Sequence, residues 1–514
     1  MPKLKLCKAA FLVFALWQPF GTALATGQSP SDSITAAKIK DRVYFLASDA
    51  LEGRYPGSRG FHIAAEYAAS QFRAAGLLAV VRSDGQQSYF QPVPIAKRDV
   101  QNPPVVMLET PVGEHTFAGG DLKIITSEGL VGTGESIPVV FAGFGISESA
   151  AGWDELGGLD IAGKAVLFIM GAPTKNGKPI LREDLHRIYV PMNSVVRKLP
   201  AMRGAAAALV LVGDEMLKAF ESLPAVPEES QFTLDDREPG AFRLPPLGVL
   251  SPGLSKAIFG DKGLPGPETV SEGGFPIGEL DGVALSIRVP IRDEKMQTRN
   301  IIGLVEGTDP CLKEQVIVIS AHLDHLPPTP DGRIHPGAND NASGAAALLE
   351  IAGAIASQPP RRSVLLVLFA AEEGGAMGSR YFLSHCPVSA GRIVADLNMD
   401  MIGRTESGLE DNRAQYALDS SRITPAFTRL IEEVNARTVG WPLRFEHALN
   451  LGDSDHCFFN ELGIPAVNFY TGKIPDTHTP TDTPDKLDYD KAAKIAQLVY
   501  RIAMELGIRD PLWN

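Results

Sequence analysis

The second half of the chain contains five short segments in which imidazoles or carboxylates stand beside small or apolar residues. Imidazole nitrogens and carboxylate oxygens are ligands that zinc accepts, and carboxylates also act as general bases. These residue types could therefore bind metal ions and move protons. The segments are "AHLDH" with His322, Asp324 and His325, "PGANDNASG" with Asp340, "FAAEEGG" with Glu372 and Glu373, "NMDMIG" with Asp400, and "DTHTPTDT" with His478.

Each of these residues, taken alone, has an ordinary structural explanation. Asp340 opens an expected helix and could be its N-cap, the Glu372–Glu373 pair could be a solvated turn, and His478 could be a loop residue. Asp400 is harder to explain in this way, because it ends an apolar strand and a buried carboxylate needs a partner. The coincidence of all five segments favours one shared site.

The elements that would position these residues follow from the pattern after residue 298. Expected strands and helices alternate there, which is typical of an α/β fold with a mixed, mostly parallel sheet flanked by helices. Ligands of such sheets bind beyond the carboxyl ends of the strands. The expected strands are 300–307, 314–322, 361–373, 392–403 and 465–472, and the expected helices are 341–357, 421–440 and 488–507.

The donor set fits two metal ions better than one. Two imidazoles and three carboxylates are too few for two closed cages, but they suit two zinc ions about 3.5–4 Å apart that share a carboxylate and a water. One carboxylate of the glutamate pair would stay free as a general base. Asp324, two residues after His322, is expected to accept the other ring N–H of that histidine.

The remaining sequence divides into three further parts. Residues 1–25 contain three lysines, a short apolar run and the small-x-small sequence Ala23–Ala25, which predicts a signal peptide, with a membrane anchor as the alternative. We expect a mature protein that is secreted or periplasmic and has no membrane span. Residues 26–112 and 294–514 would form the catalytic domain, and 113–293, rich in short strands and Pro/Gly loops, a small β-rich inserted domain.

Composition excludes several other classes of function. The formal net charge is −13, and it becomes −16 once the three lysines of residues 1–25 are removed, so nucleic acid is an unsuitable partner. The sequence contains neither GxGxxG after a strand nor a P-loop motif. Cys311, Cys386 and Cys457 allow at most one disulfide, and the lack of a CxxC pair argues against a cysteine zinc site.

The five segments, in this order, resemble those of the co-catalytic zinc exopeptidases. That family includes secreted bacterial leucyl-type aminopeptidases, and its distant relatives include glutamate carboxypeptidases, glutaminyl cyclases and the transferrin receptor. The early stretch "FLASDALEGRYPGSRG" is similar to the N-terminal signature of the family. The stretch from "FAGFGI" to "RGAAAALVLVG" resembles its inserted protease-associated domain.

The resemblance implies a role for each residue of the site. His322 and Asp400 would hold one zinc ion, Glu373 and His478 the other, and Asp340 would bridge the two. Glu372 would be the general base of a water that bridges the ions, and Asp324 the carboxylate behind His322. Substrate contacts are expected from Arg404, His456 or Tyr470. Many relatives have tyrosine where Thr477 stands and histidine where Ile474 stands, so the group that stabilises the oxyanion is left open.

The function implied is a zinc-dependent exopeptidase that acts on peptides, most simply an aminopeptidase. A carboxypeptidase of the same fold is the alternative, with Arg404 as a candidate for the substrate carboxylate. A non-enzymatic binding protein and a glutaminyl cyclase are further alternatives. Oligomeric state and side-chain preference do not follow from the sequence.

Overall fold

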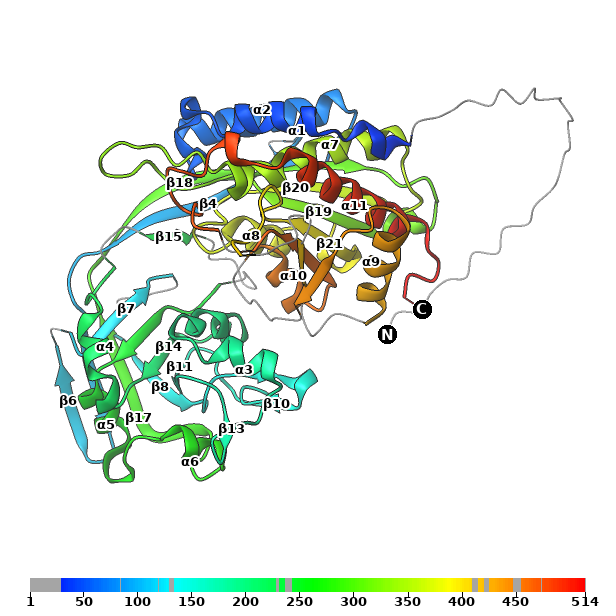
Figure 1. Cartoon of the computed structure of the whole chain (residues 1–514). Helices are drawn as coiled ribbons and strands as arrows, with labels where there is room; N and C mark the ends of the chain where they lie inside the picture. Colours follow the sequence, from blue (N-terminus) through cyan, green and yellow to red (C-terminus); the bar gives the residue numbers. More distant parts are fainter. Residues whose placement is uncertain are drawn as a thin grey trace, which may run out of the picture.

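A computed structural model describes the chain as two sheets, each with its own helices (Figure 1). The described residues are 29–83, 85–118, 120–128, 134–227, 231–235, 243–408, 415–419, 425–446, 454–472 and 474–513. The predicted signal peptide lies outside them. Within the described residues, no helix is long and apolar enough to cross a membrane.

The larger sheet has ten strands and confirms the expected α/β fold with a mixed sheet. Its centre, β20-β19-β21-β24, is parallel, whereas β4 and β18 on one side and β22 on the other run antiparallel to their inner neighbours. In spatial order the strands are β15 (Gln231–Leu234), β4 (Phe90–Val100), β18 (Ile291–Val305), β20 (Ser363–Phe369), β19 (Val316–His322), β21 (Ile393–Met399), β24 (Ala466–Tyr470), β22 (Gln415–Asp419) and β23 (Leu443–Glu446), with β1 (Leu78–Ala79) beside β18.

Helices cover both faces of this sheet, and this explains why its central strands are almost wholly buried. One face carries α1 (Ala36–Leu46), α2 (Arg59–Ala74), α7 (Gly344–Ser357) and α11 (Tyr489–Ile508), with α9 (Pro425–Arg437) packed against α11. The other face carries α8 (Met377–Ser384) and α10 (His456–Glu461).

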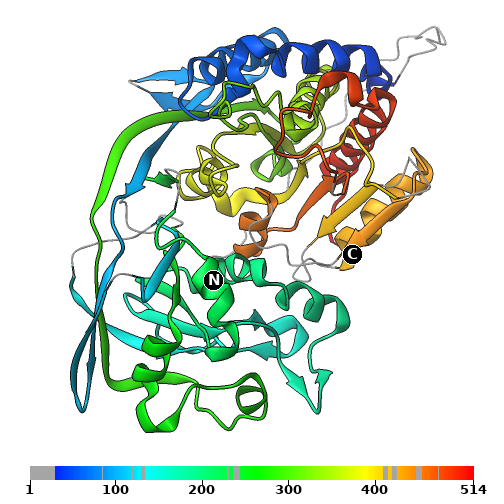
Figure 2. The same cartoon turned by 60° about the vertical axis from the view of Figure 1, so that its left-hand side comes forward.

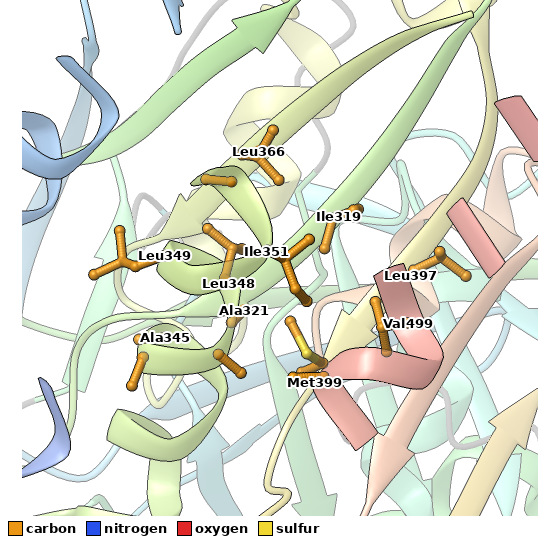
Figure 3. Close-up of a cluster of buried hydrophobic side chains, with 14 of the residues drawn as sticks. Ile319, Ala321, Ala345, Leu348, Leu349, Ile351, Leu366, Leu397, Met399 and Val499 are labelled. Carbon is orange, nitrogen blue, oxygen red and sulfur yellow. The ribbon is translucent and has the colours of Figure 1, made fainter. Parts of the chain in front are cut away.

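The core beneath α7 shows how sequence produces this packing. The helix reads "GAAALLEIAGAIAS", and its alanines let it lie close to the sheet while Leu348 and Ile351 fill the space between them. Figure 3 shows these side chains against Ile319 of β19, Leu397 of β21 and Val499 of α11. A rigid core therefore lies directly behind the strands that end at the predicted site.

The smaller sheet has eight strands and lies between the two chain segments that build the larger one. Its centre, β8-β11-β14-β16, is also parallel. In spatial order the strands are β6 (Gly113–Phe117), β5 (Val105–Thr110), β17 (Gly278–Arg288), β8 (Ser136–Phe141), β11 (Ala165–Ile169), β14 (Ala207–Leu211), β16 (Leu247–Leu250) and β7 (Leu122–Thr126). Its helices are short: α3 (Glu183–Tyr189), α4 (Leu217–Ser222), α5 (Pro252–Phe259), α6 (Pro267–Ser271) and the 3-10 segment Met192–Met202.

The two parts are joined along one side of the molecule by the extended strands β4 and β18, as Figure 2 shows. The strands do not follow the predicted division at 113 and 293. β5 already belongs to the smaller sheet, and β15, from within 113–293, pairs with β4 in the larger one. A buried ion pair also connects the parts, with Arg380 of α8 donating to both carboxylate oxygens of Glu128.

Three short ladders complete the strand inventory. They pair β2 (Val81–Ser83) with β3 (Gln86–Ser88), β9 (Ser147–Glu148) with β10 (Trp153–Asp154), and β12 (Thr174–Lys175) with β13 (Lys178–Pro179). The thiols of Cys311 and Cys386 are free.

Candidate metal centre

Four parallel neighbours, β20, β19, β21 and β24, bring their carboxyl ends to one edge of the larger sheet. His322 is the last residue of β19, Asp400 follows β21 directly, and Glu372 and Glu373 follow β20 after two alanines. His478 comes from the loop after β24. All four strand ends therefore deliver a side chain to the same place, as the sequence pattern predicts.

The first group of donor atoms surrounds the Nε2 atom of His322. This nitrogen lies 3.2 Å from Oδ1 of Asp400 and 3.3 Å from Oδ1 of Asp340. Oε2 of Glu372 is further away, at 4.0 Å. Asp400 and Asp340 thus lie nearest to His322, and Glu372, although farther away, also lies within ligand reach of His322 and Asp400.

The second group surrounds Glu373. The Nε2 atom of His478 lies 3.1 Å from Oε2 of Glu373 and 3.1 Å from Oδ2 of Asp340. A second imidazole approaches from the other side, with Nδ1 of His325 at 2.6 Å from Oε1 of Glu373 and 3.9 Å from Oδ2 of Asp340. Asp340 therefore presents one carboxylate oxygen to each group.

These spacings fit zinc. Donor atoms about 2.0 Å from a tetrahedral ion lie about 3.3 Å from one another, and the separations around Nε2 of His322 and Nε2 of His478 are 3.1–3.3 Å. Nitrogen with carboxylate oxygen is also the donor chemistry that zinc accepts. The residues present could hold two ions that share Asp340.

The two imidazoles beside Glu373 differ in how well they suit an ion. His478 is half exposed, and its single nitrogen is equally close to Asp340 and Glu373. Its backbone adopts a φ of 58°, an uncommon left-handed conformation for a non-glycine residue. His325 is buried, and its 2.6 Å contact is a hydrogen bond to Glu373. His325, Asp340 and Glu373 also form a group that could hold an ion, but the equal 3.1 Å distances favour His478 as the ligand and His325 as the residue that orients Glu373.

The ring of His322 is fixed by a peptide oxygen rather than by the predicted carboxylate. Nδ1 lies 3.1 Å from the carbonyl oxygen of Asp324 but 3.9 Å from its Oδ1. The Nδ1–H donating to this carbonyl leaves a lone pair on Nε2, which is the form that binds metal. The Asp324 carboxylate instead accepts a hydrogen bond from the backbone N–H of Glu372, at 3.1 Å.

The electrostatics of the cluster separate the two glutamates. Burial raises the pKa of the Glu372 carboxyl well above its usual value, and neighbouring Asp400 adds to the rise, although His322 opposes it. Burial and Asp340 also act to raise the pKa of Glu373, but interactions with His325 and His478 outweigh them and lower it to about 2. Hydrogen bonds to Asp340 and Glu373 raise the pKa of His478 to about 11.

The negative charge of the buried carboxylates in this centre must be compensated by positive charge. Burial raises the pKa of Asp324 to about 6 and that of Asp455, just before α10, to about 7. A buried group of like charges is unfavourable unless cations compensate it. Metal ions at the two groups would supply that charge, and their binding would displace protons from His322 and His478.

Two further residues support the site and were not assigned by sequence reasoning. The Asp482 carboxylate accepts hydrogen bonds from the backbone N–H groups of Asn339 and Asp340, and so fixes the loop that carries Asp340. Asp482 belongs to the "DTHTPTDT" segment, so its motif was visible. Asp455 stands next to His456 in "SDHCFF" but was overlooked, because its approach to Glu372 depends on the fold.

The expected substrate contacts are less well supported by the geometry. Arg404 forms an ion pair with Asp476 at 3.1 Å. His456 is buried in α10, with ring nitrogens 3.7 and 3.9 Å from Sγ of Cys457, and burial lowers its pKa to about 3. Tyr470 ends β24, next to Tyr416 of β22. The Oγ1 atom of Thr477 is buried and has no hydrogen-bond partner among the described residues.

The part of the chain that carries these donors is similar to known proteins. Residues 300–503 match the model of peptidase family M28. This part of the chain is similar to that family. The M28 segment, residues 300–503, contains all the donors described above, whereas the whole smaller sheet and the N-terminal helices precede it.

Relatives of the M28 segment carry peptidase names. Aminopeptidase YwaD of Bacillus subtilis is 29% identical over 220 residues, which are 39% of this chain and 43% of that protein. A probable leucine aminopeptidase of Arthroderma otae is 30% identical over 227 residues, 42% of this chain and 59% of that protein. The chain thus spans about half the length of the curated relatives it matches.

Among solved structures, an aminopeptidase from Aneurinibacillus sp. strain AM-1 aligns over 93% of this chain and 95% of its own. The TM-score is 0.47 and the sequence identity 19%.

Proposed function

We propose that this protein is a zinc-dependent aminopeptidase with two co-catalytic ions. His322 and Asp400 would hold one ion, Glu373 and His478 the other, and Asp340 both. The observation that carries the proposal is the spacing of 3.1–3.3 Å between nitrogen and oxygen donors in two groups joined by Asp340. The names of the relatives of the M28 segment support the choice of reaction.

Zinc, when bound, would polarise the scissile carbonyl and make water a better nucleophile. The side chains of the protein transfer the proton and orient the general base. Glu372 lies farther from His322 than Asp340 and Asp400 do, so we assign its carboxylate to taking a proton from water rather than to holding an ion. Because burial raises its pKa, Glu372 keeps that proton until the leaving amine accepts it. The Asp324 carboxylate orients Glu372 through the backbone N–H.

The charge of the site suits the amino end of a peptide. The substrate α-ammonium would approach a centre rich in carboxylates, and Asp324 and Asp455, which are fully buried behind it, would add negative charge without touching the substrate. A carboxypeptidase would need a cation for the α-carboxylate, and the candidate Arg404 is already paired with Asp476, whose Oδ1 also binds Lys486. The structure therefore favours N-terminal over C-terminal recognition.

The experiment uses peptides with one end blocked. Purified protein, with and without zinc, is given aminoacyl chromogenic substrates, their N-acetylated forms and C-amidated peptides. We expect chelator-sensitive cleavage of free and C-amidated substrates and none of N-acetylated ones. Cleavage that requires a free carboxylate would indicate the carboxypeptidase alternative, and cyclisation of an N-terminal glutamine would indicate a glutaminyl cyclase. No zinc-dependent reaction at all would leave the binding-protein alternative.

Glu372→Gln tests the proposed base. The amide keeps the shape of the side chain but cannot accept a proton, so we expect kcat to fall by at least about 10²-fold while zinc content is unchanged. Glu314→Gln is the matched control, because Glu314 is an exposed carboxylate paired with Arg392. Near-normal kcat in Glu372→Gln would remove Glu372 from this role.

We also propose that the protein is exported and acts on peptides outside the cytoplasm. The support is the predicted cleavage site after Ala25. Mass spectrometry of the protein from its native host should find a mature N-terminus at residue 26. An intact N-terminus would contradict export by this route.

A further inference from the structure

Arg54 lies at the end of the "DALEGR" stretch, far in sequence from every donor of the metal centre and outside the M28 segment. Its side chain has no exposed surface at all. A fully buried guanidinium is rare, because its charge must be compensated and its five N–H groups need acceptors. The contacts of Arg54 therefore carry information about its purpose.

Within the described residues, the side-chain hydrogen bonds of Arg54 all go to peptide oxygens. Nε donates to the carbonyl of Leu323 at 3.0 Å, Nη1 to that of Pro336 at 2.8 Å, and Nη2 to that of Gly337 at 3.1 Å. Nη1 also donates to the carbonyl of Leu46, the last residue of α1. One planar side chain thus connects three separate segments.

Two of these segments carry metal donors. Leu323 directly follows His322, and Pro336 and Gly337 lead into the loop that ends at Asp340. His322 and Asp340 are the pair whose donor atoms lie 3.3 Å apart in the first group. Arg54 therefore holds together, from behind, the two backbone segments whose separation sets this distance.

The backbone around Arg54 is built for this close approach. Gly53 has a φ of 79°, and a Cβ atom there would lie 2.2 Å from the carbonyl oxygen of Leu326. Arg54 itself has a φ of 58°. Left-handed conformations at a non-glycine residue cost energy and persist only where surrounding contacts hold them in place.

Charge gives Arg54 a second connection to the centre. Burial lowers the pKa of its guanidinium to about 10, while Asp324, Asp340, Asp482 and Glu373 act in the opposite direction. The cation is thus stabilised by the carboxylates of the site, although its hydrogen bonds are to carbonyls. Lysine could supply the charge, but not three diverging N–H groups in one plane.

We propose that Arg54 is a positioning residue of the metal centre, which fixes the spacing of His322 and Asp340 by binding the peptide oxygens of their loops. The inference rests on the proposed function only in assuming that the centre binds zinc. By this proposal, a residue of the N-terminal segment positions metal ligands that lie in the M28 segment.

The test measures zinc affinity rather than activity. Arg54→Lys and Arg54→Gln are compared with the unaltered protein by competition with a chromophoric chelator at constant pH and at 10 °C, where marginally stable variants are most easily kept folded. Loss of groups that orient metal ligands typically weakens binding about 10–100-fold. We expect a loss of this size in both variants, with the glutamine variant at least as weak as the lysine variant.

Arg362→Lys is the matched control. Arg362 is also buried and donates to peptide oxygens, those of Leu506 and Arg509, but it stands at the opposite end of β20. We expect this variant to lose thermal stability while its zinc affinity stays within about 2-fold of the original, because it touches no ligand loop.

Each outcome decides the question. Unchanged zinc affinity in the folded Arg54 variants would overturn the proposal, as would an equal loss in Arg362→Lys. If neither Arg54 variant folds while Arg362→Lys does, Arg54 serves the fold as a whole and the assignment is wrong. A protein that binds no zinc even unaltered would refute the proposed function instead, so the two failures are distinguishable.

Discussion

The two sheets share one arrangement and differ in what stands at its edge. Each has four parallel strands at its centre, β20-β19-β21-β24 in the larger sheet and β8-β11-β14-β16 in the smaller. The carboxyl ends of the first set carry His322, Glu372, Glu373 and Asp400. In the second set, β8 and β11 end in the runs "FAGFG" and "FIMG", which hold no titratable side chain, and the acids that follow β14, Asp214 and Glu215, are exposed.

In the smaller sheet, a buried lysine and a glutamate form hydrogen bonds with the backbone groups at the strand ends. Lys198, from the 3-10 segment Met192–Met202, is buried and donates to the carbonyl of Phe144, beyond β8, at 2.7 Å. It also approaches the carbonyls of Ile169 and Gly171 at the end of β11. The carboxylate of Glu155 accepts from the backbone N–H groups of Phe144 and Ile146.

The difference shows that strand topology brings a set of strand ends to one edge of a sheet, and that the side chains there determine whether this edge can bind a metal ion. At the smaller sheet the lysine and the glutamate complete the polar groups internally. At the larger sheet an excess of carboxylates remains, and metal ions are what could balance it. The corresponding edge is thus satisfied internally in the smaller sheet and forms the candidate metal centre in the larger one.

The largest effect is expected from removing the shared carboxylate of the larger sheet. The amide in Asp340→Asn offers one oxygen where the carboxylate offers two, so it cannot serve both cations. We therefore expect zinc to be lost and kcat/KM to fall by at least about 10²-fold. Asp214→Asn is the control, because Asp214 follows β14 of the smaller sheet and is exposed beside Lys256. Retention of two zinc ions by Asp340→Asn would contradict the role of Asp340 as the carboxylate that both ions share.

A smaller effect, on stability rather than on chemistry, is expected from Lys198→Met. Methionine cannot donate, so the carbonyl of Phe144 loses its partner and Glu155 loses its nearby cation. Buried polar groups left in this way cost about 1–3 kcal/mol. Chemical denaturation should show this loss at pH 7, while zinc content and kcat per folded molecule stay unchanged. A loss of zinc would mean that the two edges are not independent.

The smallest effect concerns pH. Burial lowers the pKa of Lys198 to about 7 from 10.5, so between these values the unfolded chain binds more protons than the folded one. The contribution of this group to stability therefore rises as the pH increases from 7 towards 10.5. The difference in unfolding free energy between the original protein and Lys198→Met should grow over pH 7–9. A constant difference would show that Lys198 does not titrate in this range.

The sequence predicts the edge of the larger sheet well, because His322, the glutamate pair and Asp400 lie at or just after the ends of strands, and parallel strands end together. It does not predict which atom of Asp324 binds His322, since that depends on the path of the chain after β19. Nor does it reveal that His325 orients Glu373 or that Arg54 reaches loops 269 and 282 residues away. These contacts arise from tertiary packing, which leaves no local pattern.

The boundaries of the inserted domain are also only partly predictable from the sequence. Short strands separated by Pro and Gly predict a β-rich region, but they do not reveal which sheet each strand joins. β15 returns to the larger sheet because its partner β4 offers a free edge there. Pairing partners are distant in sequence, so only the fold decides them.

The most direct test of the central claim is a crystal structure of the zinc-loaded protein, with anomalous differences measured at the zinc absorption edge. The account predicts two peaks about 3.5–4 Å apart, one among His322, Asp340 and Asp400 and one among Asp340, Glu373 and His478. A single peak, peaks at other residues, or His325 in place of His478 as the ligand of the second ion would contradict it.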